Sequence, residues 1–202
     1  MNDGRGWAGG RPLVGVLHPG RMGAAIGAAL KPVASAVVWA AAGRSEATSK
    51  RAELADLIGV PDLAAVARRC DVIISVCPPG AALSVAEEVA AALADRTGSS
   101  PLYLDANTVP PETVREVAEV IGDRAEVVDG VLLGPPAWRL GTTVLWLSGA
   151  AAPDVAALFA GSPFEARIRD GGIGAASALV GDPSSGWPKG CIPDLTAPET
   201  RL

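Results

Sequence analysis

The sequence of 202 residues has few charged side chains, and neither sign of charge is concentrated in a run. Charged residues make up 19% of the chain, below the roughly 25% typical of globular domains. The formal net charge is −5, from 17 basic and 22 acidic residues. The sequence contains no run of lysines and arginines that could bind along a phosphate backbone, so we expect no nucleic-acid partner. Hydrophobic residues at 49% are sufficient for a sizeable core.

Histidine and cysteine are also scarce. The three cysteines, Cys70, Cys77 and Cys191, have no metal-type spacing, and His18 is the only histidine. Neither a disulfide framework nor a metal site is therefore expected. No run of about 18 uncharged apolar residues could span a bilayer, and the glycine-rich N-terminus does not resemble a secretory signal. These absences predict a cytoplasmic protein without a membrane partner.

Short apolar runs alternate with helix-patterned segments along most of the chain. This alternation predicts an α/β fold in which helices cover a mostly parallel sheet. The predicted strands are 13–17, 33–39, 71–76, 102–105, a strand from 127, 142–148 and 164–168. The predicted helices are 22–30, 49–58, 62–69, 81–93, 110–121 and 154–160.

The pattern divides the chain into four parts. Residues 1–11 are predicted to be a flexible leader, and residues 12–169 form the α/β domain. Residues 170–179 are typical of the start of another helix. In residues 180–202 a proline occurs every five residues, which prevents a helix from continuing, so we predict an irregular or disordered tail there.

The stretch LHPGRMG at 17–23 follows the first predicted strand and is a candidate phosphate-binding turn. Gly20 and Gly23 hold the second and third glycine positions of a G-x-G-x-x-G fingerprint, and His18 stands at the first. Glycines there let the backbone and the following helix N-terminus approach a pyrophosphate, although an ordinary tight turn is the alternative. The candidate cofactor-binding residues of this turn are Leu17, His18, Pro19, Gly20, Arg21, Met22 and Gly23.

The segment after the second predicted strand favours NADP over NAD. It contains no acidic residue for a ribose 2′-hydroxyl. Arg44 and Ser45 instead offer a charge and a hydroxyl to a 2′-phosphate. The alternative is that Arg44 is only a solvated loop cation.

Two further strand ends supply candidate residues. Cys77 and Pro78 follow a buried strand at the edge where ligands bind in open α/β sheets, although the Cys77 sulfur is more simply a small apolar group. Asn107 follows the next strand and offers an acceptor and two donors to a ribose, a nicotinamide amide or a substrate carbonyl. A structural role in the turn is equally open for Asn107.

Taken together, six segments resemble the NADP-binding domain of the 6-phosphogluconate dehydrogenase-like and β-hydroxyacid dehydrogenase superfamily. They are LHPGRMG at 17–23, GRS at 43–45, SVCPP at 75–79, LDANTVPPET at 104–113, VDGVLLGPP at 128–136 and LWLSG at 145–149. The resemblance covers about residues 13–179. It implies a Rossmann-type, doubly wound, mostly parallel sheet with helices on both faces, binding NADP with NAD less favoured. It also implies a long helix from 170–179 into an all-α domain that completes the substrate pocket and a homodimer.

The resemblance implies hydride transfer between NADP and a small carbonyl, hydroxyacid or imine-like substrate. In the superfamily a lysine on the long helix is the general acid/base, but Val180 stands at its expected place here. Asn107 and Leu133 occupy the positions at which serines often bind the substrate in the superfamily. Lys189, among prolines, is assigned no catalytic role, so the catalytic residues are unknown.

We therefore expect a truncated or frame-shifted, weakly active or inactive reductase, with apolar surface exposed at 171–179. The alternatives are a non-catalytic NADP-binding module and a site for another nucleotide or an adenosyl group.

Overall fold

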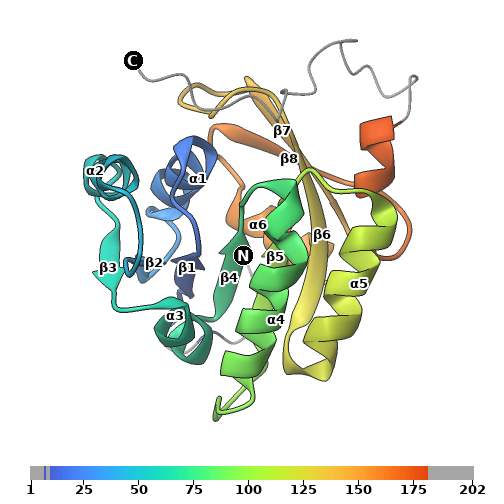
Figure 1. Cartoon of the computed structure of the whole chain (residues 1–202). Coiled ribbons are helices and arrows are strands. Elements are labelled where there is room, and N and C mark those ends of the chain that lie inside the picture. Colours follow the sequence, from blue (N-terminus) through green and yellow to red (C-terminus); the bar gives the residue numbers. More distant parts are fainter. Residues whose placement is uncertain (1–6, 8–9, 182–202) are drawn as a thin grey trace.

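The computed structural model describes residue 7 and residues 10–181 (Figure 1). Most of the predicted leader, and the tail from residue 182 with Lys189, lie outside the described residues. Within the described part, no helix has the length and apolar character needed to cross a bilayer. No three potential metal-ligating side chains gather in one group there.

The described residues form one eight-stranded sheet in the order β3-β2-β1-β4-β5-β6-β7-β8. All neighbouring strands are parallel except β6 and β7, which are antiparallel. The strands are β1 Leu13–Val16, β2 Ala36–Ala40, β3 Ile58–Val60, β4 Val72–Ser75, β5 Leu102–Asp105, β6 Glu126–Leu133, β7 Thr143–Ser148 and β8 Phe164–Ile168. This order confirms the predicted Rossmann-type, doubly wound fold.

Helices cover both faces of the sheet. They are α1 Arg21–Leu30, α2 Glu46–Leu54, α3 Leu63–Arg69, α4 Ala82–Leu93, α5 Pro111–Ile121 and α6 Ala152–Leu158. Residues of α1, α2 and α6 belong to one apolar cluster against the sheet, and residues of α3, α4 and α5 to another. In Figure 1, α3, α4 and α5 lie in front of the sheet and α6 behind it.

Several helix starts follow directly from the sequence. Asp62 caps α3, accepting a hydrogen bond from the Ala65 N–H at 2.7 Å. Proline is tolerated in a first turn because its missing N–H has no helical partner there, and α5 begins at Pro111. Both starts agree with the predicted helices.

The predicted helix over 49–58 is wrong at its C-terminal end. Helix α2 ends at Leu54, and Ile58–Val60 is the edge strand β3. Asp56 has a φ of +53°, a left-handed conformation that interrupts a right-handed helix. The sequence analysis missed β3 for this reason.

The second strand begins three residues later than predicted, at Ala36 instead of Val33. Val33 and Ala34 donate backbone hydrogen bonds to the Leu30 carbonyl in the turn after α1, so β2 begins only at Ala36.

The segment over 170–179 also differs from the prediction of a long helix. Turns lead to a short 3-10 helix, η3 Ser177–Gly181. Gly171 and Gly174 have φ values of +127° and +97°, outside the helical region. The expectation of exposed apolar surface is wrong for Ala176 and Leu179, which are 0% and 4% exposed, whereas Ala178 is exposed and Ile173 is half-buried.

Candidate functional site

The candidate site lies at the C-terminal edge of the parallel strands. There the strand order reverses, since β2 lies on one side of β1 and β4 on the other. Crevices at such a reversal are the usual ligand sites of open α/β sheets. The fold brings the twelve predicted cofactor-binding residues to this edge, because they follow β1, β2, β4 and β5.

The two glycines of the turn after β1 have different structural roles. A Cβ on Gly23 would lie 2.2 Å from the His18 carbonyl oxygen, so the packing of α1 on the turn requires glycine there. A Cβ on Gly20 would have no heavy atom within 4 Å. The φ of Gly20 is −63°, which any residue adopts. Neither packing nor conformation within the chain explains glycine at position 20.

Helix α1 begins without a cap, which makes this turn suitable for an anion. No side chain of the described residues caps its first turn, and no acidic residue lies in it. The first N–H groups of a helix have no helical acceptor and carry partial positive charge. Together with the open space at Gly20, they form a surface that fits a pyrophosphate.

His18 is half-buried at the first glycine position and is a neutral imidazole at pH 7. Burial, and then the nearby charge of Arg44, lowers its pKa to about 4. Its buried Nδ1 has no hydrogen-bond partner among the described residues. His18 therefore adds no positive charge to the turn.

Arg44 lies beside this turn in a defined position. Its Nη2 donates to the Leu17 carbonyl at 3.3 Å, and its Nε donates to the Ala40 carbonyl at 3.3 Å. The guanidinium therefore bridges the ends of β1 and β2 rather than extending into solvent. Neighbouring Ser45 caps α2, accepting a hydrogen bond from the Thr48 N–H at 3.3 Å.

Asn107 is 2% exposed, and residues of the chain occupy both functional groups of its amide. Its Oδ1 accepts from the Cys77 N–H at 2.6 Å. Its Nδ2 donates to Ser75 Oγ at 3.2 Å and to Asp105 Oδ2 at 3.1 Å. Asn107 thus joins the ends of β4 and β5, which supports the structural alternative considered from the sequence.

Cys77 lies half-buried in the same region and is protonated at neutral pH. Burial is the largest cause that raises the pKa of its thiol to about 11. A thiol is a weak nucleophile compared with a thiolate. The side chain therefore acts as a small, mainly apolar group, and Pro78 after it precedes the 3-10 turn Pro79–Ala81.

Sequence reasoning missed a row of buried polar side chains that crosses four strands. In strand register Ser75 lies opposite Asp105, Asp105 opposite Asp129, and Asp129 opposite Ser148. All four are at most 1% exposed. Burial above all raises the pKa of Asp105 to about 6, with the charge of Asp129 adding to it against the hydrogen bonds from Asn107.

Asp129 anchors the segment that follows β8. Its Oδ2 accepts from the N–H groups of Gly174, Ala176 and Ser177, each at 3.0 Å. It also accepts from Ser148 Oγ at 2.9 Å, and its Oδ1 accepts from Ser177 Oγ at 2.6 Å. A lone acidic residue inside the apolar strand VVDGVLL was the sequence signal for this role.

Comparisons with known proteins agree with this fold. A family model described as a Rossmann-like domain matches residues 3–109, just over half of the chain. No curated protein matches the sequence.

Solved structures match over most of this chain and about three fifths of their own. A conserved protein of unknown function with structural similarity to 3-hydroxyacid dehydrogenases matches with 25% identity and a TM-score of 0.71, over 83% of this chain and 61% of its own. The 3-hydroxyisobutyrate dehydrogenase of Mycobacterium tuberculosis, with L-serine, matches with 18% identity and a TM-score of 0.69, over 83% and 57%. An imine reductase from Myxococcus stipitatus in complex with NADP+ matches with 22% identity and a TM-score of 0.63, over 83% and 58%.

Proposed function

The chain belongs to the Rossmann-like domain family, and we propose that it binds a nicotinamide dinucleotide at the C-terminal edge of its sheet, with NADP preferred over NAD. The observation that carries this proposal is the uncapped start of α1 next to the open space at Gly20. An exposed helix N-terminus with no cap and no acidic side chain is suited to a pyrophosphate. The complexes of similarly folded imine reductases with NADP+ and NAD+ support the choice of ligand class.

The chain's own residues have distinct tasks in this proposal. The N–H groups of the first turn of α1 bind the pyrophosphate, while Gly20 leaves room for it. Arg44 is fixed by the Leu17 and Ala40 carbonyls through its Nη2 and Nε. Its Nη1 forms no hydrogen bond with a described residue and binds the 2′-phosphate. Ser45 contributes its hydroxyl while capping α2. The bound cofactor supplies a nicotinamide ring that exchanges hydride with a substrate.

We further propose that the domain comes from an oxidoreductase that acts on a small carbonyl, hydroxyacid or imine-like substrate, as a homodimer. The likeness to a hydroxyisobutyrate dehydrogenase and to imine reductases supports this class. General acid/base catalysis accelerates such reactions roughly 10²- to 10⁴-fold. Val180 stands at the position where the family's catalytic lysine is expected. We therefore expect weak activity or none from this chain alone.

The second candidate is a dinucleotide-binding module without catalysis. It is favoured by the polar groups after β4 and β5, which have partners within the chain: both the oxygen and the nitrogen of the Asn107 amide are hydrogen-bonded, and Cys77 is a protonated thiol. An assay of NADPH oxidation with ketoacid and imine substrates separates the candidates once binding has been shown.

Calorimetric titration with NADPH and then NADH tests the binding proposal. We expect micromolar affinity for NADPH and weaker binding of NADH. Arg44→Glu should remove this preference, because it places a negative charge beside the 2′-phosphate. Arg68→Glu is the matched control, since exposed Arg68 lies in the last turn of α3, before β4 begins. The absence of binding of either dinucleotide would contradict the proposal.

A further inference from the structure

A cavity lies beside the start of α1 and adjoins the glycine turn, with which it shares Arg21. Its volume is about 410 Å³, within the range of roughly 300–1,000 Å³ found for small-molecule sites. It is enclosed by α1, α2 and the β6–β7 loop (residues 134–142). The lining residues are Arg21, Ala24, Arg51, Leu54, Ala55, Pro135, Pro136 and Trp138. Among the predicted cofactor-binding residues, only Arg21 borders it.

The cavity carries two positive charges and no negative one. Arg21 and Arg51 line it without any acidic side chain. No described residue forms a hydrogen bond or an ion pair with either guanidinium. Glu53 of α2 pairs with Lys50 at 2.9 Å, Asp56 after α2 pairs with Lys31, and Glu46 at the start of α2 is not among the lining residues. Two guanidinium groups at one cavity attract an anion, and each matches the planar shape of a carboxylate or phosphate.

The remaining walls are apolar and open to solvent. Leu54 is 77% exposed and Trp138 is 64% exposed. Large apolar side chains exposed around a hollow are typical of binding sites. The small side chains Ala24 and Ala55 are buried and leave the interior free. A ligand that fits these walls has an apolar body next to its anionic group.

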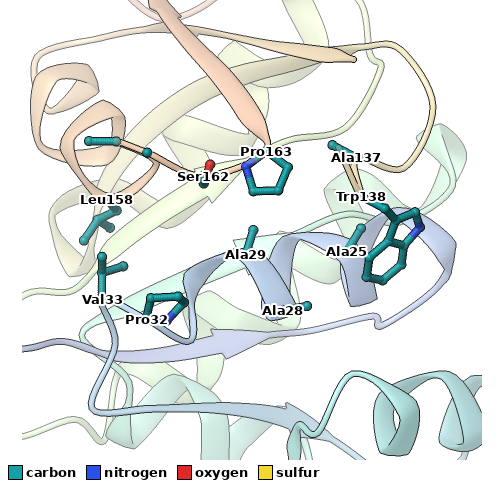
Figure 2. A pocket seen from close by; sticks show the side chains of 12 residues that line it. Ala25, Ala28, Ala29, Pro32, Val33, Ala137, Trp138, Leu158, Ser162 and Pro163 are labelled. Carbon is teal, nitrogen blue, oxygen red and sulfur yellow. The ribbon is translucent and has the colours of Figure 1, made fainter. Parts of the chain in front are cut away.

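The wall formed by the β6–β7 loop is held in place. The Thr143 hydroxyl donates to the Pro135 carbonyl. Gly134 adopts a φ of +134°, and a Cβ there would lie 2.5 Å from the Thr142 carbonyl oxygen. Trp138 lies at one end of an apolar groove along α1, close to Ala25, as Figure 2 shows. That neighbouring groove holds about 230 Å³ and has no charged lining residue, so the arginines distinguish the larger cavity.

We propose that this cavity is a binding site for a small organic anion, a carboxylate or phosphate ester that carries an apolar or aromatic group. The anionic group contacts Arg21 and Arg51, and the apolar group packs between Trp138 and Leu54. The site shares Arg21 with the dinucleotide turn but none of the other predicted cofactor-binding residues, and it does not depend on the proposed function.

The test is a calorimetric titration of the full chain with phenylacetate, with the uncharged 2-phenylethanol as the matched ligand. Phenylacetate should bind saturably and at least about tenfold more tightly than the alcohol, the effect of losing one charged hydrogen-bonded contact. Phenyl phosphate titrated in parallel distinguishes the two anion classes by their affinities.

Variants locate the site. Arg51→Met should weaken phenylacetate binding about tenfold or more. Lys50→Met removes the same charge from the adjacent, exposed residue and should leave binding unchanged. Trp138→Ala should weaken binding of the aromatic part, and since Trp138 is mostly exposed this variant should fold normally. NADPH affinity should be the same in Arg51→Met as in the original chain, which separates this inference from the dinucleotide proposal.

Three results would overturn the inference. One is equal binding of the acid and the alcohol or no binding of either. Another is equal phenylacetate affinity in Arg51→Met and Lys50→Met. The third is displacement of phenylacetate by saturating NADPH, which would place the anion in the dinucleotide turn.

Discussion

The turn after β1 and the turn after β5 lie at the same edge of the sheet but use their polar groups in opposite ways. After β1, helix α1 starts without a cap, and the space beside Gly20 is open. After β5, Asn107 donates to and accepts from Ser75, Cys77 and Asp105 within the chain. The first turn is open to a ligand and the second is closed on itself. The number of polar atoms in a residue therefore does not identify a binding residue, because their existing partners decide what they can bind.

The largest effect is expected from Asp129→Ala in β6, opposite the end of β5 where the closed turn begins. The substitution leaves the buried N–H groups of Gly174 and Ser177 and two buried hydroxyls without their acceptor, while the Ala176 N–H keeps Ser148 Oγ at 2.9 Å. Each buried donor without a partner costs about 1–3 kcal/mol, so the free energy of unfolding should fall by more than about 3 kcal/mol in urea denaturation. Asp123→Ala, at an exposed position, should change it by less than about 0.5 kcal/mol. Equal losses in the two variants would show that the Asp129 contacts do not stabilise the fold.

The open turn predicts a contrast between its two glycines. Gly23→Ala forces a Cβ against the His18 carbonyl and should destabilise the fold by about 1–3 kcal/mol. Gly20→Ala should leave stability unchanged but weaken NADPH binding, because its methyl group enters the space assigned to the pyrophosphate. Denaturation and calorimetry of both variants check this, and full NADPH affinity in Gly20→Ala would contradict the assigned use of that space.

Burial favours the neutral forms of His18 and Asp105, with opposite effects on stability. As the pH falls from about 6.5 to about 4, His18 takes up a proton only in the unfolded chain, so its contribution to stability is lost. Between about pH 6 and 3.8, Asp105 takes up a proton first in the folded chain, so its contribution increases as the pH falls.

Single substitutions should separate these two contributions. Relative to the original chain, Asp105→Asn should lose stability more steeply between pH 6 and 4, by on the order of 1 kcal/mol since one pKa unit is worth about 1.4 kcal/mol. His18→Asn should lose less stability than the original chain as the pH falls from about 6.5 to about 4. Urea denaturation at several pH values measures both, and parallel profiles for the two variants would refute the assignment.

The smallest effect is expected at Ser45, which lies after β2 at the same edge of the sheet and whose hydroxyl already has a partner. Ser45→Ala removes the cap of α2 and should lower stability by about 1 kcal/mol. Ser45→Asp keeps a capping acceptor and should retain stability, while its charge should weaken NADPH binding more than that of NADH. Equal loss of both cofactors would argue against a 2′-phosphate at this position.

The sequence predicted the architecture better than the details of the site. The cap at Asp62 and the proline in the first turn of α5 are local signals, and the structure confirms both helix starts. Strand β3 was missed because it has only three residues, lies at the sheet edge and follows the left-handed Asp56. Within 170–179 the deciding contacts come from Asp129, more than 40 residues earlier, so the pattern of 170–179 alone could not reveal them. The roles of Arg44 and the glycine turn toward a cofactor stay predictions.

The Asp129 contacts also determine how the domain would respond to mechanical force. A pull on the chain beyond Gly181 reaches η3 first, and η3 is joined to β6 through the carboxylate of Asp129. The load therefore passes to a strand in the interior of the sheet before it reaches the edge strand β8. Tension applied at this end should be resisted by several hydrogen bonds acting together, rather than peeling β8 away one bond at a time.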